Sequence, residues 1–472
     1  MVEHDAVIVG AGPNGLAAAI TLAEKGLKPA ILEGNNKIGG GARSSELTLA
    51  GFIHDTGSAI HPFGAASPFY SSLPLSQFGL EWINSPAALA HPFDDGSAVI
   101  LGPSIAATAE TLGVDAKKYT NLIRPCVGQW DKLIIDLLGT RRFPQHFLTL
   151  ARFGLKGFCS AKIFTDRYFT GFRAKGFFAG LAAHSALPLN QIPSAAFGLT
   201  LCIAGHTIGW PVPKAGTGSL TTALSKYLYK LGGSIVTGHY VKSAADLPSS
   251  KSYFFDTSPA TLVKIYDDLL PAGYKKKLQN YQYGPGVFKI DWALSAPIPW
   301  KAKECTQALT VHLGGTFDEI AKSELAAWHG RIIEKPFVIL AQPSLFDSSR
   351  MPRNKHIAWA YCHVPNNSPS DMTEYIEAQI ERFASGFREL ILARHVSTPA
   401  KLEAENPNLV GGDIVGGAQT LKQILCRPTC NLVPYSTPLK GVYICSSSTP
   451  PGAGVHGMCG YHAASAYLSS LM

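Results

Sequence analysis

Apolar and polar positions at the start of the chain follow the order strand, turn, helix, strand. After Asp5, an apolar run over residues 6–9 ends at Gly10, and Gly12 and Gly15 follow at fixed spacing. Apolar positions at helical spacing come next, and a second apolar run ends in Glu33. This pattern is typical of the βαβ unit that binds dinucleotides.

Each residue of this unit has a physical task in holding a cofactor. Gly10 permits the tight turn, Gly12 lets the backbone approach a pyrophosphate, and Gly15 lets the helix lie close to the strand. Phosphates would meet free N–H groups at the helix N-terminus, where the helix dipole favours negative charge. Glu33, about 20 residues beyond the glycines, is placed to accept hydrogen bonds from ribose hydroxyls. The sequence therefore predicts a dinucleotide site, with a ligand-free glycine turn as the alternative.

The same patterns predict further elements along the chain. A helix is expected to begin near Gly218, another over residues 373–394, and a last one after a glycine-rich turn near the C-terminus. The strands that the pattern predicts are residues 233–241, 283–300, 337–342, 356–363 and 441–445. Residues 337–342 and 356–363 are expected to join 283–300 in one sheet.

The order of these elements predicts an α/β protein with two discontinuous domains, since 472 residues exceed one simple core. A Rossmann-like cofactor domain is expected over residues 1–70, 205–285 and 405–472. An inserted α+β substrate domain is expected over residues 71–204 and 286–404.

Composition and hydropathy also indicate where in the cell the protein is expected. With 46% hydrophobic and 16% charged residues, the chain is typical of a well-packed globular protein. No apolar run reaches the roughly 18 residues of a membrane-spanning helix. The first strand begins at Asp5, which leaves no room for a signal peptide, so we expect the cytosol or an organelle matrix rather than secretion.

The nine cysteines show no Cys-x-x-Cys pair and no metal-ligand cluster. Cys426 and Cys430 are too far apart in sequence for a dithiol motif. We therefore expect reduced, mostly buried thiols and no metal site.

Almost the whole net charge of +8 lies in one segment. Residues 141–175 carry eight basic side chains against the single acid Asp166, and phenylalanines interleave with them through residue 178. Interleaved cations and rings suit an anionic membrane surface. The alternative is a set of amphipathic helices whose rings are core and whose cations are solvated. Nothing else in the chain points to nucleic acid, so none is expected as a partner.

A second glycine cluster and the C-terminal turn extend the first motif. Gly39-Gly40-Gly41-Ala42-Arg43 follows Glu33, and Asp55-Thr-Gly57 follows that. Near the C-terminus, residues 446–460 read Ser-Ser-Ser-Thr-Pro-Pro-Gly-Ala-Gly-Val-His-Gly-Met-Cys-Gly. With Gly-Ala-Gly-Pro-Asn-Gly at residues 10–15, these motifs resemble the phytoene desaturase-like flavoproteins, relatives of the FAD-dependent amine oxidases.

The likeness is closest to the branch called phytoene dehydrogenase-related, or pyridine nucleotide-disulfide oxidoreductase domain-containing protein 2. It runs from residue 5 to about 468, with internal similarity at residues 297–300, 312–315, 359–365 and 410–414. The resemblance implies a Rossmann-like FAD-binding domain of the p-hydroxybenzoate-hydroxylase type. It also implies non-covalent FAD along the interface with the substrate domain.

The resemblance further implies which residues bind the cofactor. Glu33 would take the adenosine ribose, and the backbone of Val241 would meet adenine. The phosphates would contact the two glycine clusters: Gly10, Gly12, Pro13, Asn14, Gly15, Gly39, Gly40, Gly41, Ala42 and Arg43. The isoalloxazine side would contact Gly57, Ser58 and Ala59, and the flavin ring and ribityl chain would contact Gly454, Val455, His456 and Met458.

Two positions depart from the family pattern. Gly41 stands where amine oxidases carry an arginine that touches FAD, and Arg43 is expected to take that place. Ala215 stands where this branch usually has glycine.

Lys289 and His456 are the candidate catalytic residues. By resemblance, Lys289 matches the strand where amine oxidases place a lysine that holds a water against the flavin. Desolvation can lower the pKa of such a lysine. The alternatives are a surface lysine on an edge strand and a structural histidine in a glycine-rich loop. His61, Trp210, His363 and Tyr461 are further candidates for lining the pocket, with ordinary core roles as the alternative.

These observations predict an FAD-dependent oxidoreductase that removes a hydride from a hydrophobic or amine-like small molecule. Dehydrogenase, desaturase and oxidase activity stay open, as do the electron acceptor (oxygen, quinone or NAD(P)) and a homodimer. The alternative is a lipid-binding or chaperone-like protein without turnover, as in the Rab GDP-dissociation inhibitors of related fold.

Overall fold

Five parallel strands form the sheet that the first glycine motif predicts. The computed structural model describes residues 4–140 and 144–471. The strand order is β16–β10–β1–β2–β9, and every neighbouring pair is parallel. The strands are β1 (Ala6–Val9), β2 (Pro29–Leu32), β9 (Ser234–Val236), β10 (Tyr253–Phe255) and β16 (Val442–Ile444). Three distant stretches of sequence thus build one Rossmann-like sheet.

Helices cover both faces of this sheet, because side chains along a strand alternate between faces. Ala6 and Ile8 pack in the core that includes α1 (Pro13–Ala23), α11 (Gly218–Lys230) and α18 (Met458–Ser470). Val7 and Val9 pack against α12 (Pro259–Ile265) and α13 (Ala272–Gln279). Gly460 lets α18 cross α1 closely, since a Cβ there would collide with the carbonyl of Asn14.

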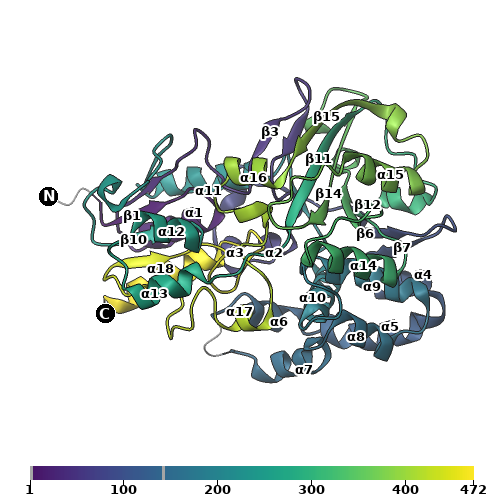
Figure 1. Ribbon diagram of the computed structural model, residues 1–472, viewed down its shortest axis with the longest axis horizontal. Helices are drawn as coiled ribbons and strands as arrows, with labels where there is room; N and C mark the ends of the chain where they lie inside the picture. Colours follow the sequence, from purple (N-terminus) through teal and green to yellow (C-terminus); the bar gives the residue numbers. More distant parts are fainter. Residues whose placement is uncertain (1–3, 141–143, 472) are drawn as a thin grey trace.

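A second sheet has seven strands and lies at the upper right of Figure 1. Its order is β15–β11–β14–β13–β12–β6–β7, antiparallel throughout except for the parallel pair β12–β6. The strands are β6 (Ala87–Pro92), β7 (Ala98–Leu101), β11 (Gly286–Leu294), β12 (Ala308–Leu313), β13 (Val338–Ala341), β14 (His356–Val364) and β15 (Ile391–Ser397).

Helices from the middle of the chain lie below this sheet in Figure 1, and both termini lie at the opposite end of the molecule. The helices below the sheet are α4 (Ile105–Thr111), α5 (Ala116–Val127), α6 (Trp130–Leu137), α7 (Phe147–Gly157), α8 (Ala161–Tyr168), α9 (Phe172–Ala183), α10 (Ser194–Thr207) and α14 (Phe317–Trp328). On the other face, α15 (Thr373–Phe383) packs into a second core. Within the described residues, no helix has both the length and the apolar character needed to cross a bilayer.

Short elements connect the two sheets. The two-stranded ribbons are β3 (Ser44–Glu46) with β4 (Ile53–Asp55), and β5 (Trp82–Ile83) with β8 (Val212–Pro213). The remaining helices are α2 (Pro62–Ala65), α3 (Pro68–Ser72), α16 (Pro399–Glu405) and α17 (Leu421–Leu425).

The α/β class with a Rossmann-like domain is confirmed. The strands of the first sheet fall in the three segments expected for the cofactor domain, and those of the second in the two expected for the substrate domain. The boundaries between these segments stay a prediction.

The helix expected over residues 373–394 is wrong in its second half. The helix ends at Phe383, Gly386 takes a left-handed conformation with φ of 89°, and β15 begins at Ile391. β15 pairs with β11, placing Val396 opposite Ile290. Pairing with a distant strand overrides the local helical pattern there. The strands expected over 233–241 and 283–300 are shorter in the structure, as β9 and β11.

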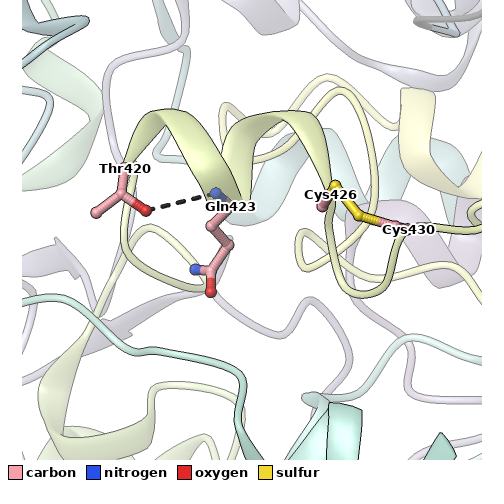
Figure 2. Close-up of a disulfide and its surroundings, with 4 residues drawn as sticks. All are labelled: Thr420, Gln423, Cys426 and Cys430. Carbon is pink, nitrogen blue, oxygen red and sulfur yellow. Dashed lines mark hydrogen bonds between the residues drawn. A yellow bond between two sulfur atoms is a disulfide. The ribbon is translucent and has the colours of Figure 1, made fainter.

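The expectation of free thiols is wrong for one pair. Cys426 and Cys430 form a disulfide directly after α17, drawn in Figure 2. Their Cα atoms lie 4.4 Å apart because the chain turns tightly between them, which is within bridging distance. The seven other cysteines are free, and all but Cys159 are buried.

The aromatic side chains of the basic segment divide between the core and the surface, and contact of this segment with a membrane stays a prediction. Arg141, Arg142 and Phe143 lie outside the described residues. Five aromatic side chains are core: Phe153, Phe164, Phe169, Phe177 and Phe178. Three are more than half exposed: Phe147, Phe158 and Phe172. Among the cations, Lys162 and Lys175 both pair with Asp166.

Candidate functional site

The first glycine loop forms one end of a large cavity. Gly10 has φ of 103°, and its N–H donates to the carbonyl of Leu32, so the chain turns sharply after β1. The Gly39 N–H donates to the carbonyl of Ala11 at 2.9 Å and fixes the second glycine cluster against the first. Gly15 packs on Gly10 with no room for a side chain. The two clusters thus form one backbone cradle.

Glu33 lies where the sequence places it, at the end of β2 and on the cavity wall. One carboxylate oxygen accepts the N–H of Ala11 at 2.8 Å, and the other accepts the N–H of Asn35 at 2.9 Å. Two fixed backbone donors orient the carboxylate. Oε1 also accepts a hydrogen bond from the Asn35 side-chain amide at 3.2 Å, whereas Oε2 keeps a second lone pair that can accept a hydrogen bond from a ribose hydroxyl.

The cavity has a volume of about 1040 Å³ and runs from the glycine loops to the second sheet and the helices α6, α7 and α10. The predicted site residues that line it are Gly10, Gly12, Pro13, Asn14, Glu33, Gly40, Gly41, Gly57, Ser58, Ala59, Val241, Lys289, Gly454, Val455 and His456. Residues from both chain ends and from the middle therefore meet around one space.

The other predicted site residues do not line the cavity. Gly15, Gly39 and Ala42 support the cradle from behind, and Met458 begins α18 with its N–H on the His456 ring. Arg43 is turned away, because its guanidinium donates to the carbonyl of Glu405 at 3.3 Å. The structure does not place Arg43 where the missing arginine at position 41 would act.

The C-terminal glycine turn holds His456 at the cavity wall. Its Nδ1 accepts the N–H of Met458 at 3.0 Å, and its carbonyl accepts the hydroxyl of Ser67 at 2.7 Å. Burial lowers the pKa of His456 to about 3, so the ring is neutral. With Nδ1 as acceptor, Nε2 carries the proton, and this buried atom has no partner among the described residues.

Several buried polar atoms of the cavity wall share this lack of a partner. Within residues 4–140 and 144–471 they are Asn14 Oδ1, Thr257 Oγ1, Thr310 Oγ1, Trp359 Nε1 and His456 Nε2. Buried polar atoms are normally hydrogen-bonded. Such atoms at both ends of one cavity fit a long ligand with several polar groups, and a flavin dinucleotide has this character.

Lys289 lies in the middle of the second sheet rather than on an edge strand. β11 is flanked by β14 and β15, and the Lys289 side chain is only 5% exposed. Its ammonium forms an ion pair with Asp291 and lies 5.7 Å from the centre of the Trp359 ring. Burial raises the pKa of Asp291, while the Lys289 charge acts in the opposite direction. A buried, paired cation thus faces the cavity.

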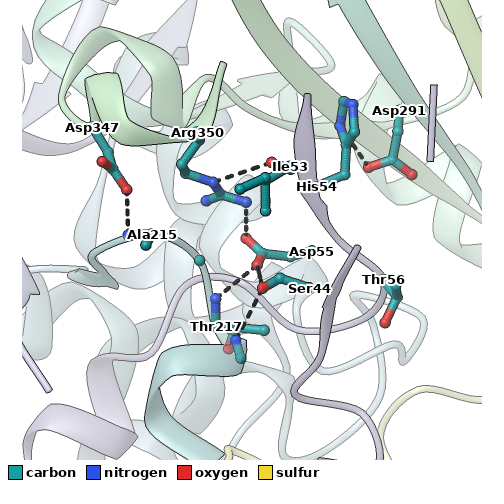
Figure 3. Close-up of polar contacts among 12 residues, drawn as sticks. Ser44, Ile53, His54, Asp55, Thr56, Ala215, Thr217, Asp291, Asp347 and Arg350 are labelled. Carbon is teal, nitrogen blue, oxygen red and sulfur yellow. Dashed lines mark hydrogen bonds and ion pairs between the residues drawn. The ribbon is translucent and has the colours of Figure 1, made fainter. Parts of the chain in front are cut away.

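His54 extends this polar cluster, as Figure 3 shows for His54 and Asp291. The His54 Nδ1 lies 3.7 Å from an Asp291 oxygen, and its Nε2 shares a hydrogen bond with Thr48 at 2.8 Å. Burial, with the charges of Lys289 and Arg350, lowers the pKa of His54 to about 3. The charge of Asp291 is therefore balanced by Lys289 and not by His54.

A buried ion pair between Asp55 and Arg350 fixes the loop that leads to Gly57 (Figure 3). The two groups are 2.7 Å apart and fully buried. Asp55 also accepts the N–H of Thr217 and the hydroxyl of Ser44, both at 2.7 Å. Burial opposes the charge, but Arg350 and these hydrogen bonds hold the pKa of Asp55 below its usual value.

Ala215 adopts a conformation that suits glycine, with φ of 64°. Its N–H donates to Asp347 at 2.8 Å, which holds the turn beside the Asp55 cluster. The family's usual glycine at this position therefore has a backbone reason.

The far end of the cavity is mostly apolar. Its polar members include Asp136, Thr140, His184, Thr200, Trp210, Thr310 and Tyr361, and its apolar members include Leu137, Leu138, Leu150, Phe153, Phe158, Ala196, Phe197, Leu201 and Ile339. Trp359 and Tyr361 present nearly parallel rings, 11° apart in orientation.

Of the four further pocket candidates, only Trp210 lines the cavity. His61 is buried and bonded to the Thr217 hydroxyl at 2.5 Å. His363 pairs with Glu324 at 2.7 Å. Tyr461 packs its ring against Phe69 on the outer side of α18. His61 and His363 are therefore core residues, and Tyr461 is a partly exposed surface residue.

The disulfide loop lies beside the cavity. Leu421, Ile424 and Leu425 of α17 line the cavity, and Thr420 caps this helix through the N–H of Gln423 (Figure 2). Inside the loop, the buried Arg427 donates to Gln419, Tyr281 and the carbonyl of Gly416. The loop is anchored by these contacts.

Sequence reasoning missed Asp256, Thr257, Tyr240 and Asn408, which also line the cavity. Asp256 follows β10 directly, and ligands bind at the carboxyl ends of parallel strands. That position was the available signal. Asn408 comes from a loop whose approach depends on the fold: its side-chain amide donates to the carbonyl of Asp256 at 2.9 Å.

Comparison with known proteins agrees with this geometry. Residues 8–73 match the NAD(P)-binding Rossmann-like domain family. Over 98% of its length, the chain is 23% identical to the rat pyridine nucleotide-disulfide oxidoreductase domain-containing protein 2, covering 93% of that protein. It is 22% identical to 4,4'-diapolycopene oxygenase of a Methylomonas species, over 95% of this chain and 94% of the relative.

A solved structure shows the same fold. Putrescine oxidase bound to putrescine superimposes with a TM-score of 0.63 at 16% identity, covering 99% of both chains. The resemblance to the phytoene desaturase-like and amine oxidase superfamily is confirmed. These similarities support an oxidoreductase as the general class.

Proposed function

Because the chain belongs to the superfamily of phytoene desaturase-like proteins and FAD-dependent amine oxidases, we propose that it is an FAD-dependent oxidoreductase. It removes a hydride from a hydrophobic small molecule. The observation that carries this proposal is the single cavity of about 1040 Å³, which joins the glycine cradle to an apolar chamber beside Lys289. Bound FAD supplies the hydride acceptor.

The residues of the cradle divide the work of binding. Glu33 accepts the ribose hydroxyls, Val241 covers adenine, and the cavity-lining backbone of Gly12, Asn14, Gly40 and Gly41 receives the phosphates. Gly57–Ala59 and Gly454–His456 hold the flavin end. The unpartnered Nε2 of His456 is a donor for this part of the cofactor.

Lys289 provides a fixed cation at the reacting end. Its ion pair with Asp291 holds the ammonium in place, and its position on the cavity wall lets it donate a hydrogen bond to a water or to the substrate. Asp55, Arg350 and the rest of their cluster keep the neighbouring loop rigid. The protein's part is thus orientation, water exclusion and charge placement.

The apolar lining of the chamber favours a neutral substrate over an amine. The acids of the described lining are Glu33, Asp136 and Asp256. Glu33 and Asp256 lie at the glycine cradle, and Asp136 accepts the N–H groups of Gln145 and His146. Beside the apolar chamber, the charge of Lys289 is balanced by Asp291, so this pair attracts neither an ammonium group nor an anion, and the apolar wall determines which substrate fits. The name of the Methylomonas relative, 4,4'-diapolycopene oxygenase, supports a hydrocarbon-like substrate.

Anaerobic reduction of the flavin tests this function. The holoprotein is mixed with neutral lipophilic donors, with amines and with NAD(P)H, and flavin bleaching is followed. We expect bleaching by a neutral lipophilic donor and none by amines. Bleaching by amines alone would contradict the substrate class. Flavin that no donor reduces would favour the lipid-binding alternative without turnover.

We further propose that α7 rests on an anionic membrane and passes lipophilic substrate into the cavity. Leu150, Phe153 and Gly154 of this helix line the cavity. Its outer surface exposes Phe147, Leu148 and Leu155 at 67%, 68% and 82%. The helix also carries Arg152 and Lys156, which can meet lipid headgroups. One helix thus joins an exposed apolar surface to the substrate chamber.

A further inference from the structure

An acidic side chain occupies the glycine cradle itself. Asp256 follows β10, the strand beside β1, and lines the cavity. Its Oδ2 accepts the N–H of Gly15 at 2.9 Å, in the first turn of α1. The residue is only 8% exposed. A carboxyl group therefore uses one of the N–H donors that a phosphate would be expected to meet.

The carboxyl group lies directly against the glycine backbone. A Cβ built at Gly12 would be 2.5 Å from Asp256 Oδ2. Cβ atoms built at Gly10 and at Gly15 would each be 3.3 Å from Asp256 Cβ. All three glycines of the motif thus surround this side chain. A diphosphate that approaches the same backbone must contact Asp256.

The surroundings of Asp256 disfavour its negative charge. Burial raises the pKa of Asp256 to about 7; the Gly15 N–H opposes this rise, and the charge of Glu33 adds to it. In the described chain, the charge of Asp256 in turn raises the pKa of its titratable neighbours Tyr70, Cys445 and Cys459. Burial raises the pKa of each of these, so they are neutral, and none of the four groups is a cation.

A second anion would make the ionised form still less favourable. The diphosphate of FAD is negatively charged, and like charges in contact within a poorly solvated site repel strongly. A protonated carboxyl group instead offers an O–H donor to a phosphate oxygen.

We propose that Asp256 holds the cofactor diphosphate as a neutral acid, donating its O–H to a phosphate oxygen, so that FAD binding takes up one proton. This inference rests on the proposed FAD site. It assigns to Asp256 a binding role and makes cofactor affinity depend on pH. The proton comes from solvent, and no bond other than the O–H is formed.

The change in FAD affinity with pH depends on the fraction of protein in which Asp256 carries a proton. If only the protonated form binds, the apparent Kd rises as this fraction falls. For a group titrating near neutrality, the Kd rises about tenfold per pH unit above its pKa, and by about 100-fold at two units above it.

The experiment measures FAD binding to protein freed of its flavin, by fluorescence quenching from about pH 6 to about pH 9. Calorimetry in two buffers of different ionisation enthalpy counts the protons taken up. The test variant is Asp256→Asn, which keeps an N–H donor and cannot ionise. The matched control is Asp115→Asn, since Asp115 is also buried and accepts backbone N–H groups, from Thr170 and Gly171 in the helical region.

We expect the wild type and Asp115→Asn to lose affinity with rising pH, and to take up about half a proton where the pH equals the pKa of Asp256 and close to one proton at higher pH. Asp256→Asn should bind with little pH dependence and no proton uptake. A flat wild-type profile, or a slope that Asp256→Asn retains, would overturn the inference while leaving the FAD site intact. Binding by Asp256→Asn but never by wild type would overturn it too, since Asp256 would then exclude the cofactor. Folded proteins that never bind FAD would refute the proposed function itself.

Discussion

At the scale of single residues, partners decide what a side chain can do. Lys289 and His456 were candidates because of the motifs around them, and both lie on the cavity wall. Their partners come from other parts of the fold. Asp291 pairs with Lys289, and the His456 ring is neutral because it is buried. These contacts turn two candidates into groups with defined charge.

Replacing Lys289 tests its part in the reaction. We expect Lys289→Met to keep bound flavin and to slow anaerobic flavin reduction by about 100-fold, the lower range for a lost proton-transfer group. The exposed Lys303→Met serves as control and should leave the rate unchanged. Stopped-flow absorbance of the flavin gives the rate.

The loss of Lys289 also leaves Asp291 without its cation, which can cost about 3–5 kcal/mol of stability. The double variant Lys289→Met with Asp291→Asn should regain stability without regaining rate. A double variant as fast as wild type would contradict a chemical role for Lys289.

Sequence motifs predicted the residues that line the glycine end of the cavity far better than those that line its apolar end. The glycines, Glu33 and the C-terminal turn act mainly through backbone geometry, which local sequence determines. The free thiols expected at Cys426 and Cys430 are wrong, because the chain turns tightly between them. Arg43 does not line the cavity, since its guanidinium donates to the Glu405 carbonyl, and its contact with the cofactor stays a prediction. Asp256 has no motif, since its role comes from the strand beside which β10 lies.

At the scale of elements, the local pattern of apolar residues predicts that a helix or strand is present. It does not predict where the element ends, because pairing with distant segments determines its ends. The strands over 337–342 and 356–363 were found because both are buried apolar runs in the second sheet. The segment after Phe383 was mistaken for helix because its polar and apolar residues fit both periods. Its hydrogen bonds with β11 decide the outcome. The segment 141–178 shows the same limit, since only the fold separates its core rings from its exposed ones.

The outer surface of α7 carries the membrane prediction. We expect the double variant Leu148→Ser with Leu155→Ser to sediment less with anionic liposomes than wild type, because it loses two exposed apolar side chains. Binding of the wild type should also weaken with salt, since headgroup contacts are screened. Leu269→Ser is the matched control, as Leu269 is 59% exposed but lies between α12 and α13. Equal sedimentation of all three proteins would refute a docking role for α7.

At the scale of the whole molecule, buried histidines make the fold sensitive to acid. Burial lowers the pKa to about 3 for His54, His184 and His456, and to about 4 for His61, His91 and His206. The unfolded chain binds protons on these residues near their ordinary pKa of 6.5, while the folded chain does not. These histidines therefore make their full contribution to the free energy of unfolding above pH 6.5, and this contribution is lost as the pH falls toward 4. His363 acts in the opposite sense, since Glu324 raises its pKa against the effect of burial.

Unfolding by urea over a pH series measures this loss. Each neutral buried histidine contributes a slope of up to about 1.4 kcal/mol per pH unit between its two pKa values. His91→Gln keeps a donor for the carbonyl of Gly315 and should reduce the slope by about one histidine's share. The exposed His329→Asn should leave the slope unchanged. A free energy of unfolding that stays constant from pH 7 to 5 would contradict this account.

The proposed function depends on one cavity that the two sheets share, with the cofactor at one end and the substrate at the other. The flavin content of the purified protein tests it most directly. The protein is expected to be yellow and to release one FAD per chain on heat denaturation, since no covalent attachment is expected. A colourless protein that also fails to take up added FAD at any pH, while remaining folded, would contradict it.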